Sequence, residues 1–157
     1  MPLAAFQRGT GERVHGGETG VVYSNVGQLV FQRAPRLGAD ASLFAACKIA
    51  ADTLAFTLVF SSIDTGQHVP GSRHRLGCAG DIVAVYPVGE PVKKATLANS
   101  FCRQLLTLFR DAGWHVGEGG DWPGLLAGPA HSALNPSGIP HANHVHISVA
   151  RPRHHAS

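Results

Sequence analysis

Long apolar runs and cysteines are scarce in this chain of 157 residues. No apolar run reaches the roughly 20 residues that span a bilayer, so we expect no membrane span, and the N-terminus lacks the apolar core of a secretory signal. Three cysteines are too few for a disulfide framework. Cys47 and Cys102 fall on apolar faces of predicted helices, where we expect small buried residues of a reduced protein.

Lysine is also scarce, since three lysines stand against ten arginines, and the formal net charge is +3. The basic residues are spread along the chain, without the basic stripe and interleaved aromatic residues typical of nucleic-acid binders. We therefore expect no nucleic-acid partner. The charge indicates a solvated surface or a mild attraction to an anionic polymer such as a bacterial wall.

The length fits one domain with a buried core, and apolar periodicity predicts two amphipathic helices and several strands. The helices are expected at residues 40–55, with Asp40 as N-cap, and at residues 96–112, which end before Gly113. Strands are expected at residues 57–61, 81–86, 114–117 and 144–149, with a hairpin whose strands at 21–23 and 29–31 flank a turn. Residues 62–80 and 119–140, rich in glycine and proline, are predicted loops.

Histidines and an aspartate stand where these loops meet strands. Asp81 opens an apolar strand, and a carboxylate there is costly to desolvate unless it is paired, hydrogen-bonded or bound to metal. His74 precedes it by seven residues, so the intervening loop must fold His74 back toward Asp81. Period-2 alternation places His144 and His146 on one face of the last strand.

These residue types predict a zinc site. His74, Asp81 and His146 would supply three ligands that Zn²⁺ accepts, leaving a fourth tetrahedral position for water, which is typical of catalytic sites. Each residue taken alone has a simpler interpretation: a surface histidine, a structural aspartate and a solvent-facing strand residue. The zinc interpretation depends on their combination.

The motif Ser72-x-His74-x-x-Gly77-x-Ala79-x-Asp81, followed by His144-x-His146, resembles a family of zinc peptidases. The family includes D-Ala-D-Ala carboxypeptidases and dipeptidases, penicillin-insensitive murein endopeptidases and phage endolysins. The spacing of His141, His144 and His146 is similar to that of the murein endopeptidases. Residues 61–71 are similar to a phage-encoded branch.

The resemblance covers residues 40–150 and implies that His74, Asp81 and His146 bind zinc within a peptidase domain over residues 39–150. The implied fold is a small single α+β domain. Its central antiparallel sheet would carry the site on one face and pack two main helices on the other. Residues 1–38, which the resemblance does not cover, are interpreted as an N-terminal extension and docking arm, and residues 151–157 as a tail.

The resemblance also implies a mechanism. Zinc polarises the scissile carbonyl and lowers the pKa of its water from about 15.7 to about 7, and a base takes the proton. Many members place a carboxylate three residues before the last ligand, but that position here is Asn143, which cannot accept a proton. His144 is the expected catalytic base because it shares the face of His146 and has an ordinary pKa of about 6.5, and His141 is second. Glu118 and Asp121, in the long loop, are further candidates for this base.

Many members stabilise developing negative charge with an arginine upstream of the first motif. No arginine lies between Arg36 and Arg73, so the expected substrate-binding residues are Gln67, His68 and Arg73. Trp122, in the long loop, could line a substrate groove. The alternative for the first three is an ordinary surface position, and for Trp122 a local packing anchor.

We therefore expect a zinc metallopeptidase that hydrolyses a peptide bond in bacterial peptidoglycan. The alternative is a non-catalytic zinc-containing binding module, as in the Hedgehog signalling domain of this fold, or a virion structural component that docks through residues 1–38. Without an export signal, we expect the protein to be made in the cytoplasm and delivered to the bacterial cell wall by a phage.

Overall fold

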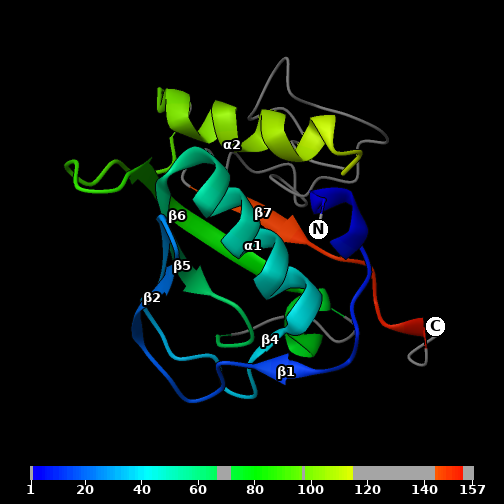
Figure 1. The fold of residues 1–157 in the computed structure, drawn as a ribbon. Coiled ribbons are helices and arrows are strands. Elements are labelled where there is room, and N and C mark those ends of the chain that lie inside the picture. Colours follow the sequence, from blue (N-terminus) through cyan, green and yellow to red (C-terminus); the bar gives the residue numbers. More distant parts are fainter. Residues whose placement is uncertain (1, 67–71, 97, 115–143, 154–157) are drawn as a thin grey trace.

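A five-stranded mixed sheet and two α-helices organise the fold (Figure 1). The computed structural model describes residues 2–66, 72–96, 98–114 and 144–153. The strand order is β2-β3-β5-β6-β7, and a small second sheet pairs β1 with β4. The expected class, a small single α+β domain with two main helices, is confirmed.

The helices and strands have the following bounds. The strands are β1 (Arg13–Val14), β2 (Gly20–Ser24), β3 (Gly27–Phe31), β4 (Ala39–Asp40), β5 (Phe56–Ser62), β6 (Ala79–Pro87) and β7 (Val145–Ser148). The α-helices are α1 (Ala41–Leu54) and α2 (Ser100–Asp111), and two short 3-10 helices are η1 (Leu3–Phe6) and η2 (Arg73–Leu76).

The sheet is mixed, whereas the resemblance implies a central antiparallel sheet. β3 pairs in parallel with β5, while β2 with β3, β5 with β6 and β6 with β7 are antiparallel. The reason is that α1 crosses over between β3 and β5, and a helical crossover returns the chain to the same end of the sheet.

Capping side chains set the starts of both helices. Asp40 is the N-cap of α1, as predicted, and its carboxylate accepts a hydrogen bond from the Ser42 amide. For α2 the N-cap is Asn99, which accepts from the Phe101 amide, so this helix begins four residues after the predicted start at Thr96.

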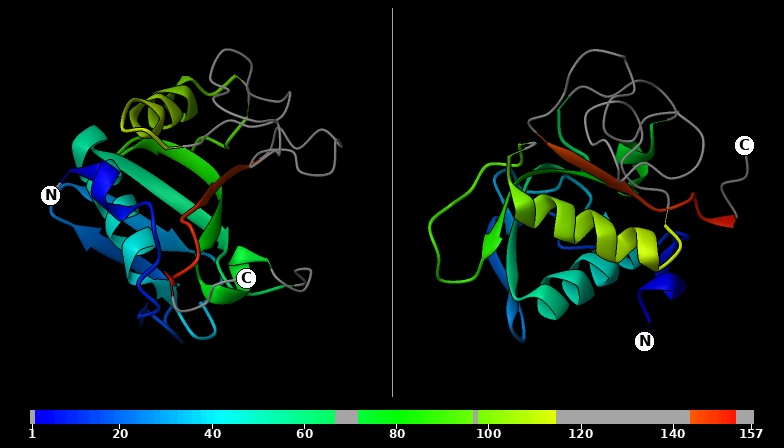
Figure 2. Two further views of the ribbon diagram at one scale, coloured as in Figure 1. Left: turned by 90° about the vertical axis from the view of Figure 1, so that its right-hand side faces the viewer. Right: turned by 90° about the horizontal axis from the view of Figure 1, so that it is seen from above.

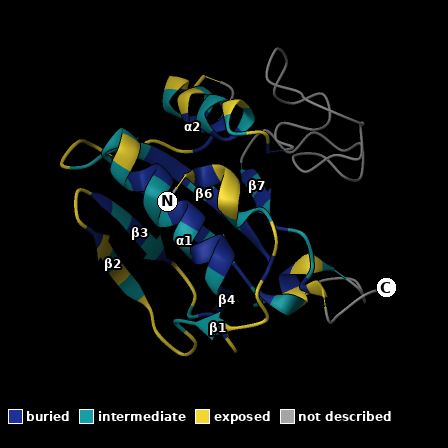
Figure 3. Ribbon diagram, turned by 45° about the vertical axis from the view of Figure 1, so that its right-hand side comes forward, coloured by how far each residue is buried: buried dark blue, intermediate teal, exposed yellow. Residues whose placement is uncertain are grey.

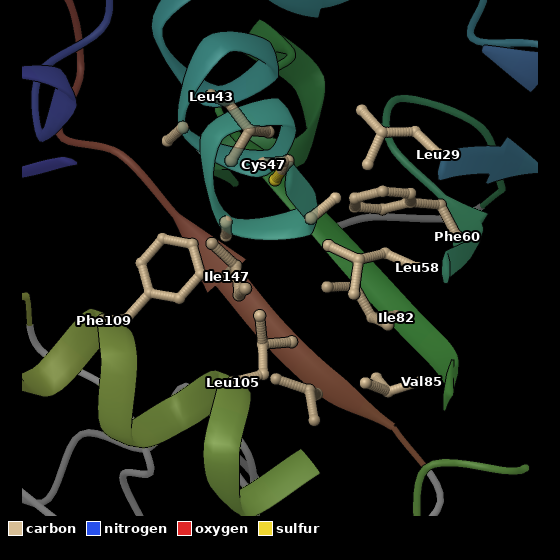
Figure 4. Packing of buried hydrophobic residues seen from close by; sticks show 14 of the residues in the cluster. Leu29, Leu43, Cys47, Leu58, Phe60, Ile82, Val85, Leu105, Phe109 and Ile147 are labelled. Carbon is tan, nitrogen blue, oxygen red and sulfur yellow. The ribbon is translucent and has the colours of Figure 1, made fainter. Parts of the chain in front are cut away.

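Both helices pack on one face of the sheet, as expected (Figure 2). In Figure 4, Leu43 and Cys47 of α1 and Leu105 and Phe109 of α2 surround Leu58, Ile82 and Ile147 of the sheet. Burial alternates along β7, where Val145 and Ile147 are buried and His146 and Ser148 are half-buried. The period-2 prediction for this strand is confirmed, and the histidine lies on the face away from the helices.

The described part of residues 1–38 contributes two strands to the main sheet. The predicted hairpin is confirmed as β2 and β3, and β3 lies inside the main sheet, with Leu29 and Phe31 in the core. Gly27 lies so close to α1 that an added Cβ would overlap the Ala51 backbone. The main sheet therefore contains strands from both sides of the boundary expected at residue 38. Exposed positions along β2 mark the edge of this sheet (Figure 3).

Other predictions fall wholly or partly on residues that the structure does not describe. Of the strand expected at 114–117, only Trp114 is described; it is buried, belongs to no strand, and donates from Nε1 to the Leu3 carbonyl. The loop at 119–140 lies outside the described residues. None of the described helices is long and apolar enough to cross a membrane.

All three cysteines, Cys47, Cys78 and Cys102, are buried and form no disulfide bond. Burial raises the pKa of the Cys47 and Cys102 thiols to about 12 and that of Cys78 to about 11. We expect no rapid reaction of the native protein with a disulfide reagent such as DTNB at neutral pH, because the thiolate is absent and the sulfur is covered. In guanidinium chloride all three thiols should react, and a rapidly reacting thiol in the native protein would contradict this packing.

Candidate metal centre

The pairing of β6 with β7 brings two predicted ligands together. Asp81 stands directly opposite His146 in this antiparallel register, although the two are 65 positions apart in the chain. Residues directly opposite in a sheet have Cβ atoms about 4.5–5.5 Å apart on the same face. The distance from Asp81 Oδ1 to His146 Nδ1 is 3.1 Å.

The third ligand, His74, comes from a capped turn inside the predicted loop. Ser72 caps η2 by accepting from the His74 amide, and Gly77 ends it with a left-handed φ of 71°. A Cβ at Gly77 would come within 2.5 Å of the Gly38 carbonyl oxygen and 2.7 Å of Arg13 Nε, so the glycine also permits close packing. The loop thus folds His74 back to Asp81, as the sequence predicts.

The three ligand atoms converge at nearly equal separations. His74 Nε2 lies 3.3 Å from His146 Nδ1 and 3.5 Å from Asp81 Oδ1. Four ligands at about 2.0–2.1 Å around a tetrahedral ion lie about 3.3–3.4 Å from one another. The His74, Asp81 and His146 group therefore matches one face of such a tetrahedron and could hold a metal ion.

The orientation of the His74 ring is set by a buried backbone carbonyl. His74 Nδ1 donates to the Ile63 oxygen at 2.8 Å, and because a carbonyl only accepts, Nδ1 carries the proton. The Nε2 lone pair is then directed at Asp81 and His146. Such an outer hydrogen bond is what fixes the tautomer of metal-binding histidines.

Proximity also changes the acid-base behaviour of these side chains. Burial by itself would raise the pKa of Asp81, but hydrogen bonds from His146 and from the protonated His74 ring, together with the charges of both histidines, lower it far below its ordinary value. Burial would lower the pKa of His74, yet the hydrogen bond and charge of Asp81, together with the Ile63 carbonyl, raise it. The group attracts positive charge, as a cation site must.

Comparisons of the chain with protein-family models, with curated proteins and with solved structures find no match. The residues of this group and their surroundings are therefore what indicates a function.

The structure describes some of the other predicted site residues. Arg73 is exposed on η2, and its Nη1 donates to Ser148 Oγ at 3.2 Å, two positions after His146. His144 is half-buried and immediately precedes β7. The remaining candidates, namely Gln67, His68, Glu118, Asp121, Trp122, His141 and Asn143, lie outside the described residues.

Sequence reasoning missed the residues around His74. The Ile63 carbonyl has no signal in the sequence, because any residue supplies that oxygen. Arg13 and Asp64 pair at 2.7 Å beside Ile63, and nothing in their local sequence indicates a partner 51 positions away.

Removing any one ligand should abolish stoichiometric metal binding. We expect His74→Ala, Asp81→Asn and His146→Ala each to lose more affinity than the roughly 10–100-fold caused by loss of an outer partner. Metal content after zinc loading, measured by mass spectrometry, checks this. His15→Asn is the matched control, because His15 lies outside the group and its φ of 57° suits asparagine. Wild-type protein without metal would contradict the site.

Metal binding should weaken as the pH falls through the raised pKa of His74. The metal needs neutral imidazole, and a pKa above the ordinary value of about 6.5 lets protons compete at higher pH than at an isolated histidine. NMR titration of the metal-free protein should show this raised pKa, and Asp81→Asn should return it toward the ordinary value. An unchanged His74 titration in Asp81→Asn would refute the assigned cause.

Proposed function

We propose that this protein is a zinc-dependent peptidase that hydrolyses a peptide bond in bacterial peptidoglycan. The observation that carries the proposal is the tetrahedral face formed by His74, Asp81 and His146, with the tautomer of His74 set by Ile63. Structural zinc sites usually have four protein ligands, whereas catalytic sites have three and an open position. Among the described residues the group has three members.

The donor set favours a transition metal such as zinc over Ca²⁺ and Mg²⁺. Two imidazole nitrogens and one carboxylate oxygen suit Zn²⁺, whereas Ca²⁺ and Mg²⁺ take oxygen ligands. A zinc ion held here would act as a Lewis acid toward a peptide carbonyl and toward water. The side chains of Asp81 and His146 are about a fifth exposed, at 22% and 21%, which supports access by a substrate.

Two further side chains have proposed roles at the rim. Arg73 presents an exposed guanidinium beside Ser148, where it would bind a carboxylate or the developing oxyanion of a peptide. His144 would take the proton from water, because the period-2 pattern of the sequence predicts that it shares the side of His146. His141 is the second candidate for this base.

The substrate class comes from the motif from Ser72 to Asp81 and from His144-x-His146, whose pattern resembles peptidoglycan peptidases. Its Ser, Gly and Asp positions have physical reasons in the structure. Ser72 caps η2, Gly77 allows close backbone packing, and Asp81 belongs to the group that could hold a metal ion. Delivery to the cell wall by a phage belongs to the same proposal.

Digestion of purified muropeptides tests the proposal. The zinc-loaded protein should release shortened peptides, detected by mass spectrometry, and a chelator should stop the reaction until zinc is restored. Asp81→Asn should be inactive and His15→Asn active. Zinc binding without hydrolysis would contradict the peptidase and favour the non-catalytic module, which retention of the protein on insoluble peptidoglycan would then detect.

A further inference from the structure

The carboxylate of Asp64 accepts hydrogen bonds from four donors, one residue after the carbonyl that orients His74. Asp64 follows Ile63, whose carbonyl orients His74, and its side chain is 3% exposed. It accepts from the amides of Arg36 at 2.5 Å, Leu37 at 2.7 Å and Gly38 at 3.2 Å, and from Arg13 Nη2 at 2.7 Å. The Asp64 carboxylate therefore holds the 36–38 segment against the backbone next to Ile63, whose carbonyl accepts from His74.

Arg13 connects the same carboxylate to the turn that carries His74. Its Nε donates to the Gly38 carbonyl at 2.7 Å, and its Nη1 reaches the Arg75 carbonyl of η2 at 3.4 Å. The guanidinium also lies against Gly77, where a Cβ would meet it. One planar group thus contacts Asp64 on one side and the η2 backbone on the other.

The hydrogen bond between His74 and Ile63 therefore spans two backbone segments that Arg13 and Asp64 hold together. We propose that Arg13 and Asp64 form a clamp that positions His74 for metal binding. These are positioning residues, since neither belongs to the ligand group. The consequence of the clamp for catalysis rests on the proposed function. The orientation of the His74 ring by the clamp does not require a bound metal.

The clamp predicts two measurable effects, one on the His74 tautomer and one on zinc affinity. In metal-free wild-type protein, at a pH above the point where the NMR titration shows the His74 ring to be neutral, long-range ¹H–¹⁵N correlation should show His74 as the single Nδ1–H tautomer. In Arg13→Met and Asp64→Asn the tautomers should mix, and zinc affinity, measured by competition with a chromogenic chelator, should fall about 10–100-fold.

Matched controls separate positioning from stability. Asp52, on α1, is also a carboxylate that accepts from two backbone amides, but these belong to Val26 and Gly27 at the β2–β3 turn. Asp52→Asn should lower the denaturation midpoint without changing zinc affinity or the His74 tautomer. Arg110→Met, on α2, is the control for loss of an arginine.

Arg13→Lys keeps the positive charge beside Asp64 but lacks the planar guanidinium, so its zinc affinity should fall by part of the full loss. This variant tests the clamp if Arg13→Met does not fold. Wild-type affinity together with an unmixed tautomer in any folded variant lacking the guanidinium would overturn the clamp. If the wild type binds no zinc, the proposed function fails, whereas mixed tautomers in the variants would still support the clamp.

Discussion

The antiparallel pairing of β6 with β7 is the constraint on which the metal group depends. It sets Asp81 opposite His146 and, through the same alternation, turns Ile82 and Ile147 toward the helices. A register shifted by one residue would move every side chain of β7 to the other face, so the core and the ligand group are specified together. The apolar face thus stabilises the arrangement that the polar face needs.

Three aspartates, in β4, in α1 and just after β5, bind backbone amides of the N-terminal third of the chain. Asp40 accepts from the amides of Thr10 and Gly11, Asp52 from the turn between β2 and β3, and Asp64 from the 36–38 segment. Each joins residues at least 25 positions apart. A segment without helical periodicity is ordered in this way, because carboxylates satisfy backbone donors that secondary structure leaves unpaired.

Much of the fold follows from local patterns. Apolar spacing and Asp40 predict α1, and alternation predicts β7, because burial of one face imposes the period of the element. The parallel pairing of β3 with β5 is not local, since it depends on where α1 returns the chain. The η2 turn at His74 was predicted only as a loop, because its cap at Ser72 and its glycine end lie among residues that equally suit irregular structure.

The sequence by itself determined the ligand types, their motif spacing and the face on which His146 lies, because these depend on residue chemistry and the strand period. Only the tertiary structure decided that Asp81 meets His146, that Ile63 orients His74, and that Arg13 reaches the turn beside it. Those contacts join residues 11 to 65 positions apart in the chain. Strand register and the path of the chain decide which of these contacts form, and no local sequence pattern encodes either.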